Sequence, residues 1–317
     1  MRALYRNSLP QLGGTQLLTD AGLETTLIFL EGLDLPCFAS YPLLGNSEGR
    51  QTLKSYFERH LAIAADHGTG FLLEAPTWRA SRDWGAQLGH GPDDLARFNK
   101  RAIELLAEVR REASSVSPIV ISGNIGPRGD GYRPDTAMSA DEAQAFHTEQ
   151  IGWFVETEAD MVSAFTISTV NEGVGIVRAA TEAGMPVVLS YTTETDARLP
   201  DGTPLGEAFE RTDMLTGGAA AYFMVNCAHP DHFRSALESD AAWLRRVWGV
   251  RANASRLSHA ELDEAEELDA GNPAELGRDY AQLKRMLSNL RVYGGCCGTD
   301  HRHIEAMADC CCQTQAA

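Results

Sequence analysis

The chain of 317 residues carries 27 lysines and arginines against 44 aspartates and glutamates, which gives a formal net charge of −17. Nucleic acids and anionic membrane surfaces are bound by clustered cations, so this charge argues against both as partners. Apolar residues make up 44% of the chain, enough to bury a sizeable core, and the length fits either two ordinary domains or one α/β barrel.

Eight short apolar runs, rich in β-branched residues, recur along the chain and predict strands. In chain order they are Leu17–Asp20, Phe71–Glu74, Ile119–Ser122, Met161–Phe165, Val187–Tyr191, Tyr222–Asn226, Val247–Arg251 and Leu290–Tyr293.

The segments between these runs have the three-to-four-residue spacing of amphipathic helices. Leu53–Ala64 predicts a helix that stops at Gly68, where a residue free to adopt positive φ is expected. Leu95–Val109 repeats the same spacing, and Val174–Thr181 leads to a further stop at Gly184. Strands therefore alternate with helices along the chain.

This alternation implies parallel strands, because a parallel connection needs a long crossover. Eight such units predict a single (β/α)8 barrel over residues 1–317, with its active site at the carboxyl ends of the strands. An open doubly wound sheet is the alternative, but no Gly-x-Gly-x-x-Gly turn follows a predicted strand. We expect the acidic run Glu261–Asp269 to be a solvated helix face, and the segment Asp309–Ala317 to be a flexible tail.

In a barrel, the residues just past the strand ends would face one mouth. They are Asp20, Glu74, Thr77, Trp78, Asn124, Thr166, Thr192–Glu194, Cys227, Asn253, Ser255, Cys296 and Cys297.

The seven cysteines predict thiols in a reducing cytoplasm rather than a secreted disulfide framework, since their number is odd and no hydrophobic leader occupies the first 14 residues. Cys296 and Cys297 lie in a glycine-rich turn and would meet Cys227 at the mouth. Three thiolates with one exchangeable position suit a catalytic zinc. A reactive pair or a vicinal disulfide is the alternative, because the Cys-x-x-Cys spacing is missing. A zinc with an open position would bind an incoming thiol as a thiolate nucleophile.

Three blocks, Thr19–Thr25, Val225–Pro230 and Gly294–Thr299, resemble in this order those of the homocysteine S-methyltransferase family, which includes betaine-homocysteine and S-methylmethionine-homocysteine methyltransferases. The resemblance spans roughly Leu17–Met307 and strengthens the zinc interpretation.

The resemblance implies a cytoplasmic enzyme that transfers a methyl group directly from an onium donor to homocysteine, giving methionine. Zn²⁺ would be held by Cys227, Cys296 and Cys297, with the substrate sulfur as fourth ligand. Asp20 would hold the substrate ammonium, and the backbone near Gly22 and Leu23 would hold its carboxylate. Thr77, Thr166 and Asn226 are further expected substrate contacts, and a homodimer is consistent with the family.

One departure from the family concerns the ammonium site. The fourth strand of family members usually ends in Glu-Thr, whereas this chain has Phe165-Thr166. Glu74 would compensate for the missing carboxylate, or it would pair with Arg79 or Arg82, or the acceptor would be a thiol other than homocysteine.

The donor would present a methyl group on a positively charged sulfur or nitrogen, as in S-methylmethionine, betaine or S-adenosylmethionine. Aromatic faces attract such groups, which favours Trp78, with Tyr132 and Trp153 as further candidates. The competing functions are a zinc hydrolase, which would favour histidine and carboxylate ligands, and a non-catalytic barrel that binds zinc or thiols. The histidines His229, His232, His301 and His303 are expected to begin helices rather than to bind metal.

Overall fold

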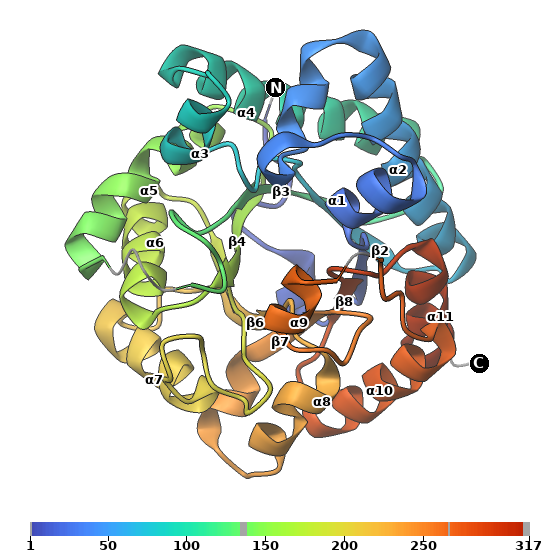
Figure 1. The fold of residues 1–317 in the computed structure, drawn as a ribbon, viewed down its shortest axis with the longest axis vertical. Helices are drawn as coiled ribbons and strands as arrows, with labels where there is room; N and C mark the ends of the chain where they lie inside the picture. Colours follow the sequence, from blue (N-terminus) through green and yellow to red (C-terminus); the bar gives the residue numbers. More distant parts are fainter. Residues whose placement is uncertain (1, 134–137, 266, 313–317) are drawn as a thin grey trace.

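The computed structural model describes residues 2–133, 138–265 and 267–312, and its centre is a closed barrel of eight parallel strands (Figure 1). The strands follow one another around the barrel in chain order, and β1 closes it by pairing with β8. Their bounds are β1 Leu17–Thr19, β2 Gly70–Glu74, β3 Ile119–Ile125, β4 Met161–Ile167, β5 Val187–Tyr191, β6 Tyr222–Asn226, β7 Val247–Ala252 and β8 Val292–Gly295.

Helices form a ring around these strands (Figure 1). Their bounds are α1 Leu23–Thr25, α2 Ser47–Asp66, α3 Arg82–Gln87, α4 Pro92–Glu112, α5 Ala140–Val155, α6 Val170–Glu182, α7 Leu205–Thr216, α8 Pro230–Phe233, α9 His259–Asp263, α10 Pro273–Met286 and α11 His301–Cys311. The predicted (β/α)8 architecture is confirmed, and so are all eight strands. The helix that was expected to stop at Gly68 ends at Asp66, with Gly68 in the left-handed region at φ 62°.

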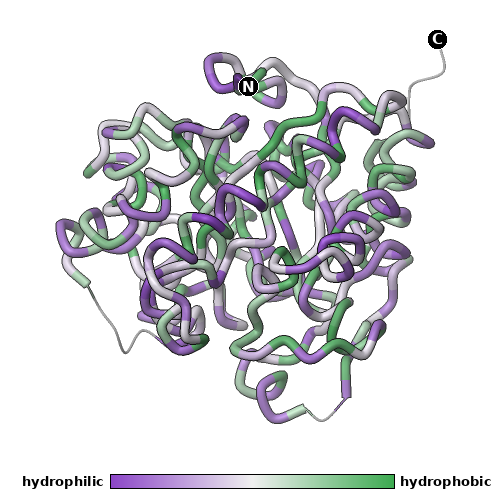
Figure 2. The backbone as a smooth tube through the Cα atoms, turned by 90° about the horizontal axis from the view of Figure 1, so that it is seen from above, coloured by the Kyte–Doolittle hydropathy of each residue, from purple (hydrophilic) through white to green (hydrophobic). Residues whose placement is uncertain are grey.

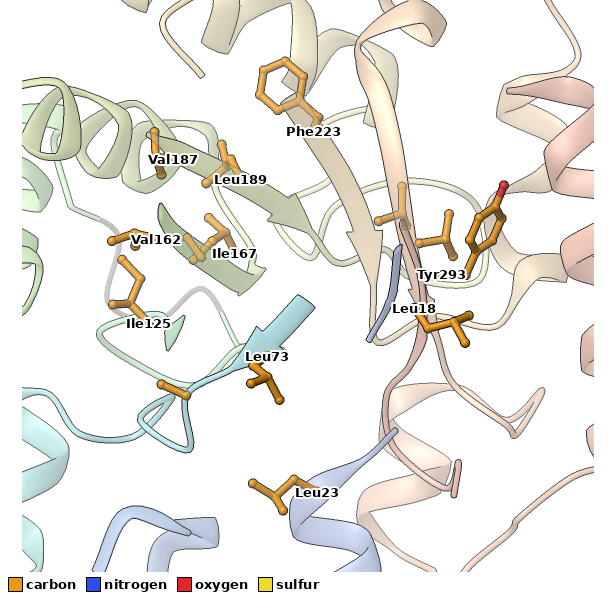
Figure 3. Packing of buried hydrophobic residues seen from close by; sticks show 14 of the residues in the cluster. Leu18, Leu23, Leu73, Ile125, Val162, Ile167, Val187, Leu189, Phe223 and Tyr293 are labelled. Atoms are coloured by element: carbon orange, nitrogen blue, oxygen red, sulfur yellow. The ribbon is translucent and has the colours of Figure 1, made fainter. Parts of the chain in front are cut away.

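The core has two layers because successive strand residues face opposite sides of the sheet. Leu17 and Leu72 belong to a cluster inside the barrel, whereas Leu18 and Leu73 belong to the larger cluster between the sheet and the helices. Figure 3 shows part of that larger cluster, in which side chains from several strands point toward the helices. Along the outer helices, hydrophilic and hydrophobic residues alternate, as expected for helices with one buried face (Figure 2).

Two expectations about surface segments were wrong in part. The described acidic residues of the run Glu261–Asp269 are exposed, as expected, but the run is helical only as far as Asp263 in α9, and several of its later residues line the cavity described below. The expected tail is helical through Cys311, and Cys311 and Cys312 are buried against the core because α11 packs on the barrel. Residues 313–317 lie outside the described part of the chain. Within that part, no helix is both long and apolar enough to cross a membrane.

Candidate functional site

A cavity of about 470 Å³ opens at the carboxyl ends of the strands. Residues within or just after the carboxyl ends of seven of the eight strands line it, so the barrel brings together side chains that are distant in sequence. The site residues predicted from sequence that line this cavity are Asp20, Gly22, Leu23, Glu74, Trp78, Thr166, Asn226, Cys227, Cys296 and Cys297.

Three cysteines meet at one side of this cavity, and we refer to Cys227, Cys296 and Cys297 as the three-cysteine site. Their Sγ atoms lie within 4.8 Å of one another, close enough for one metal ion. In the structure, Cys227 and Cys296 are joined as a disulfide and Cys297 is a free thiol. The pairing therefore links β6 to β8 rather than the two adjacent cysteines. Reduction of this disulfide would provide three sulfur ligands, a soft donor set that suits zinc.

The backbone that carries Cys227 adopts an uncommon conformation. Cys227, which follows β6, has φ 52°, and Thr166, on β4 two strands away, has φ 62°, in the region that residues other than glycine rarely occupy. Asn226 holds this arrangement: its side-chain oxygen accepts from the Thr166 N–H at 2.9 Å and from Ser190 Oγ at 2.7 Å, and its Nδ2 donates to Thr166 Oγ1 at 2.8 Å. Backbone strain that is stabilised in this way is typical of functional sites.

The turn after β8 requires glycine where the chain packs closely. A Cβ atom on Gly295 would collide with the Thr299 side chain, and Gly298 has φ 78° with the Asp269 carbonyl oxygen 2.7 Å from where its Cβ would lie. Thr299 Oγ1 also donates to the carbonyl of Cys296 at 2.7 Å. These contacts fix the backbone on both sides of the cysteine pair, which explains the glycine-rich block.

Cys297 lies next to the hydroxyl of Tyr132. Burial raises the pKa of the Cys297 thiol to about 11, with a hydrogen bond from the Tyr132 hydroxyl acting in the opposite direction. The Tyr132 ring in turn stacks on His259, with ring centroids 3.9 Å apart, and His259 Nε2 lies 2.6 Å from the Cys227 carbonyl oxygen. Through these contacts Tyr132 and His259 join Cys297, which follows β8, to Cys227, which follows β6.

Asp20 has a partner that the sequence analysis did not anticipate. Arg251 Nη1 lies 2.7 Å from Asp20 Oδ1, and both side chains are buried. Tyr56 donates a further hydrogen bond to Asp20 Oδ2 at 3.2 Å. The Arg251 guanidinium also lies 5.2 Å from the centre of the Phe165 ring. The carboxylate expected to hold a substrate ammonium is therefore already paired with a buried cation.

Glu74, by contrast, has an oxygen without a partner. Ser163 Oγ donates to Oε1 at 3.0 Å, while Oε2 is buried and makes no hydrogen bond within the described residues. Burial raises the pKa of Glu74 to about 7, with the positive charge of Arg251 opposing the shift. The predicted alternative, an ion pair with Arg79 or Arg82, was wrong: among the residues described, neither arginine pairs with Glu74, and Arg82 instead lies 3.4 Å from Glu149.

Other predicted residues have structural roles. Thr77 does not line the cavity, because its hydroxyl donates to the Asn124 carbonyl at 2.6 Å and ties together the loops after β2 and β3. Trp153 packs on the outer core cluster from α5. As expected, His229 caps α8 and His303 takes part in the cap of α11.

Several cavity-lining residues were missed as site candidates, among them Glu24, Arg79, Arg251 and His259. Arg251 carried a detectable signal, since a charged residue ends an otherwise apolar predicted strand, Val247–Arg251. Glu24 and His259 follow no strand directly, so their positions depend on loop conformations that spacing does not reveal.

Fold and site together define a class: (β/α)8 barrels with three cysteine sulfurs gathered at the carboxyl ends of the strands. The model of the homocysteine S-methyltransferase family matches residues 17–311, and the chain belongs to this family. The resemblance seen in the three sequence blocks is thus confirmed over nearly the whole chain.

Two relatives illustrate the match. Homocysteine S-methyltransferase YbgG of Bacillus subtilis (strain 168) is 26% identical over 243 residues, which cover 70% of this chain and 73% of that protein. The homocysteine methyltransferase MmuM from Escherichia coli shares the fold. Its oxidised form has a TM-score of 0.74 at 21% identity, covering 96% of this chain and 99% of that one. Its metallated form has a TM-score of 0.71 at 19% identity, with coverages of 95% and 98%.

Proposed function

We propose that this protein is a zinc-dependent S-methyltransferase that moves a methyl group from an onium donor to the thiol of homocysteine and forms methionine. The observation that carries the proposal is the three-cysteine site, whose Sγ atoms lie within 4.8 Å of one another at the mouth of the barrel. Membership of the homocysteine S-methyltransferase family and the names of YbgG and MmuM support the same reaction.

The metal would be held by Cys227, Cys296 and Cys297 once the disulfide between the first two is reduced. Bound there, Zn²⁺ supplies a Lewis acid that keeps the acceptor sulfur in its nucleophilic thiolate form. The existence of a metallated form of MmuM supports a metal at this position, and the all-sulfur donor set favours zinc. Asn226 and the turn after β8 hold the three sulfurs in place before the metal arrives.

The acceptor's amino-acid group would bind next to β1 and β2. Glu74 offers a buried oxygen without a hydrogen-bond partner, which supports it as the acceptor for the substrate ammonium. Asp20 contributes negative charge that is already balanced by Arg251. The backbone of Leu23 lines the same cavity and would take the carboxylate, whereas the Gly22 N–H already donates to Thr299 Oγ1 at 3.1 Å. Thr166 and Asn226 line the cavity as well.

Methyl transfer itself needs the donor's methyl carbon in line with the acceptor sulfur. The new sulfur–carbon bond forms as the bond between that carbon and the donor's sulfur or nitrogen breaks. The electron pair stays on the donor's sulfur or nitrogen, and this atom loses its positive charge. Trp78 and Tyr132 both line the cavity and offer aromatic surface to the onium group.

A second candidate is methyl transfer to a thiol that lacks an ammonium group. The ion pair between Asp20 and Arg251, together with Phe165, favours it, since both reduce the negative charge available to an ammonium. A non-catalytic barrel that binds zinc or thiols is the remaining alternative. The cytoplasmic location and the homodimer remain predictions.

The test uses reduced, zinc-loaded protein with homocysteine and, in turn, S-methylmethionine, betaine and S-adenosylmethionine. Methionine detected by mass spectrometry with at least one donor supports the proposal. Thioether formation with 3-mercaptopropionate but not with homocysteine would support the second candidate. Zinc binding without any methylated thiol would favour the non-catalytic barrel. Cys296→Ala is the matched control, because it should lose zinc and activity while the barrel remains folded.

A further inference from the structure

Arg79 is a buried cation in the wall of the cavity. It follows β2 by five positions, is 8% exposed and lines the cavity beside Trp78. The mechanism proposed above assigns it no role. A buried charge is costly unless it is paired, so its surroundings need an explanation.

Two indole rings enclose its guanidinium. The Arg79 Cζ atom lies 4.0 Å from the centre of the Trp78 ring and 3.5 Å from the centre of the Trp84 ring. Ligands can then approach only the edge of the planar group, where the N–H donors lie. The stacking also fixes the orientation of that edge before any ligand binds.

Most of these donors have no hydrogen-bond partner among the described residues. Nη1 donates to the Gly129 carbonyl at 3.3 Å, and Nε is buried without a hydrogen bond. Among the residues that the structure describes, no carboxylate oxygen lies within ion-pair distance of Arg79. Burial lowers its pKa to about 10, against the opposing effect of Asp130, so Arg79 remains charged at neutral pH.

Arg251, the other buried arginine of the cavity, provides a comparison within the same site. It forms an ion pair with Asp20 and also donates to the backbone carbonyl of Ala21 at 3.1 Å. Arg251 is therefore satisfied by the protein, whereas Arg79 has donors to spare. The terminal nitrogens Nη1 and Nη2 of Arg79 retain N–H groups for which the described residues provide no acceptor, and a carboxylate can accept hydrogen bonds from them.

We propose that Arg79 binds the carboxylate of the methyl donor, so that the site selects onium donors that are also carboxylic acids; this inference rests on the proposed methyl transfer. The position of Arg79 supports binding of the donor's carboxylate rather than the acceptor's. Arg79 adjoins Trp78, the aromatic candidate for the onium group, whereas the acceptor's carboxylate is expected near Gly22 and Leu23. One short donor would then place its positive end on aromatic surface and its negative end on Arg79.

The first experiment measures steady-state kinetics on the zinc-loaded, reduced protein. Whichever donor the wild type uses, S-methylmethionine or betaine, is compared with its carboxamide. The wild type should prefer the acid by roughly ten- to hundredfold in KM, the range for charge-assisted hydrogen bonds. Arg79→Gln should raise the KM for the acid by a similar factor, abolish the preference over the amide and leave the KM for homocysteine unchanged. Arg79→Lys should give an intermediate preference for the acid, because it keeps the positive charge but loses the planar set of guanidinium N–H donors.

Arg82→Gln is the matched control. It removes the same charge three positions away, from an exposed side chain that does not line the cavity, and it should behave as wild type. Thermal unfolding of each variant establishes that the fold persists. A rise in the KM for homocysteine instead of the donor, or an unchanged preference for the acid in Arg79→Gln, would overturn the inference.

A binding experiment separates this inference from the proposed function. The probe is 3,3-dimethylbutanoate, a carbon analogue of betaine that keeps the carboxylate but has no methyl group to transfer. Calorimetry on the zinc-free protein should show binding to wild type and Arg82→Gln and a loss of binding in Arg79→Gln. If the wild type binds this probe but transfers no methyl group from any onium donor in the kinetic experiment, the proposed function is refuted while the anion site is supported. No binding to wild type, or equal binding to Arg79→Gln, would refute the anion site alone.

Discussion

Replacing Glu74 by glutamine tests whether this carboxyl group is buried as the structure indicates. Its pKa is raised from 4.5 to about 7, and burial is the main cause. In the unfolded chain the group ionises near its ordinary value, so between these two pH values the folded state binds more protons than the unfolded state. The contribution of Glu74 to the stability of the wild type should therefore fall as pH rises through this window and level off above it.

The magnitude follows from the size of the shift. A change of about 2.5 pKa units corresponds to roughly 3 kcal/mol at 1.36 kcal/mol per unit. Glutamine can still accept the hydrogen bond from Ser163, but it does not titrate. The difference in unfolding free energy between wild type and Glu74→Gln should thus change by about 3 kcal/mol across the window, whatever its absolute value.

Urea unfolding of both proteins, zinc-free and reduced, at a series of pH values provides the measurement. Taking the difference removes the contribution of the other titrating groups, because they are common to both proteins. Glu267→Gln is the control, since it removes an exposed carboxylate at the cavity rim. A difference between wild type and Glu74→Gln that stays constant with pH would refute the reasoning.

Three further substitutions test how the site is held together. Gly22→Ala would place a Cβ atom 2.5 Å from the Cys296 carbonyl oxygen, so zinc affinity measured by competition with a chelator should fall, with a stability loss of about 1–3 kcal/mol; unchanged affinity would refute the close packing. Asn226→Ala removes the hydrogen bonds that hold Thr166, and chemical unfolding should show a cost of about 1–3 kcal/mol together with weaker zinc binding. Arg251→Met should destabilise the fold by about 3–5 kcal/mol, because it leaves the buried Asp20 carboxylate unpaired. Adding Asp20→Asn to this variant should recover part of that loss. A double variant no more stable than Arg251→Met would show that the two side chains are not coupled.

The barrel could be predicted because its signals are local and repeated. Each strand is a short apolar run, and both of its faces are buried, as with Leu17 and Leu18. The position of Cys227, Cys296 and Cys297 followed from the same reasoning, since residues after parallel strands must meet at one mouth. These are consequences of topology and need no knowledge of side-chain contacts.

The charge arrangement of the site could not be predicted in the same way. Whether Asp20 faces a substrate or Arg251 depends on the register between β1 and β7, which are not neighbours in the barrel. The residues after Asp263 were expected on a solvated helix face because they are acidic; their described carboxylates are exposed, but the segment leaves the helix and part of it lines the cavity. Composition indicates the average exposure of a segment but not its path across the mouth.

The central claim is that three cysteines hold a zinc ion that takes the acceptor sulfur as its fourth ligand. Zinc X-ray absorption on the reduced protein measures this directly. We expect about one zinc per chain with three sulfur ligands, and a fourth sulfur when homocysteine is added. Zinc that Cys296→Ala retains, or a sulfur coordination number that homocysteine leaves unchanged, would contradict the account.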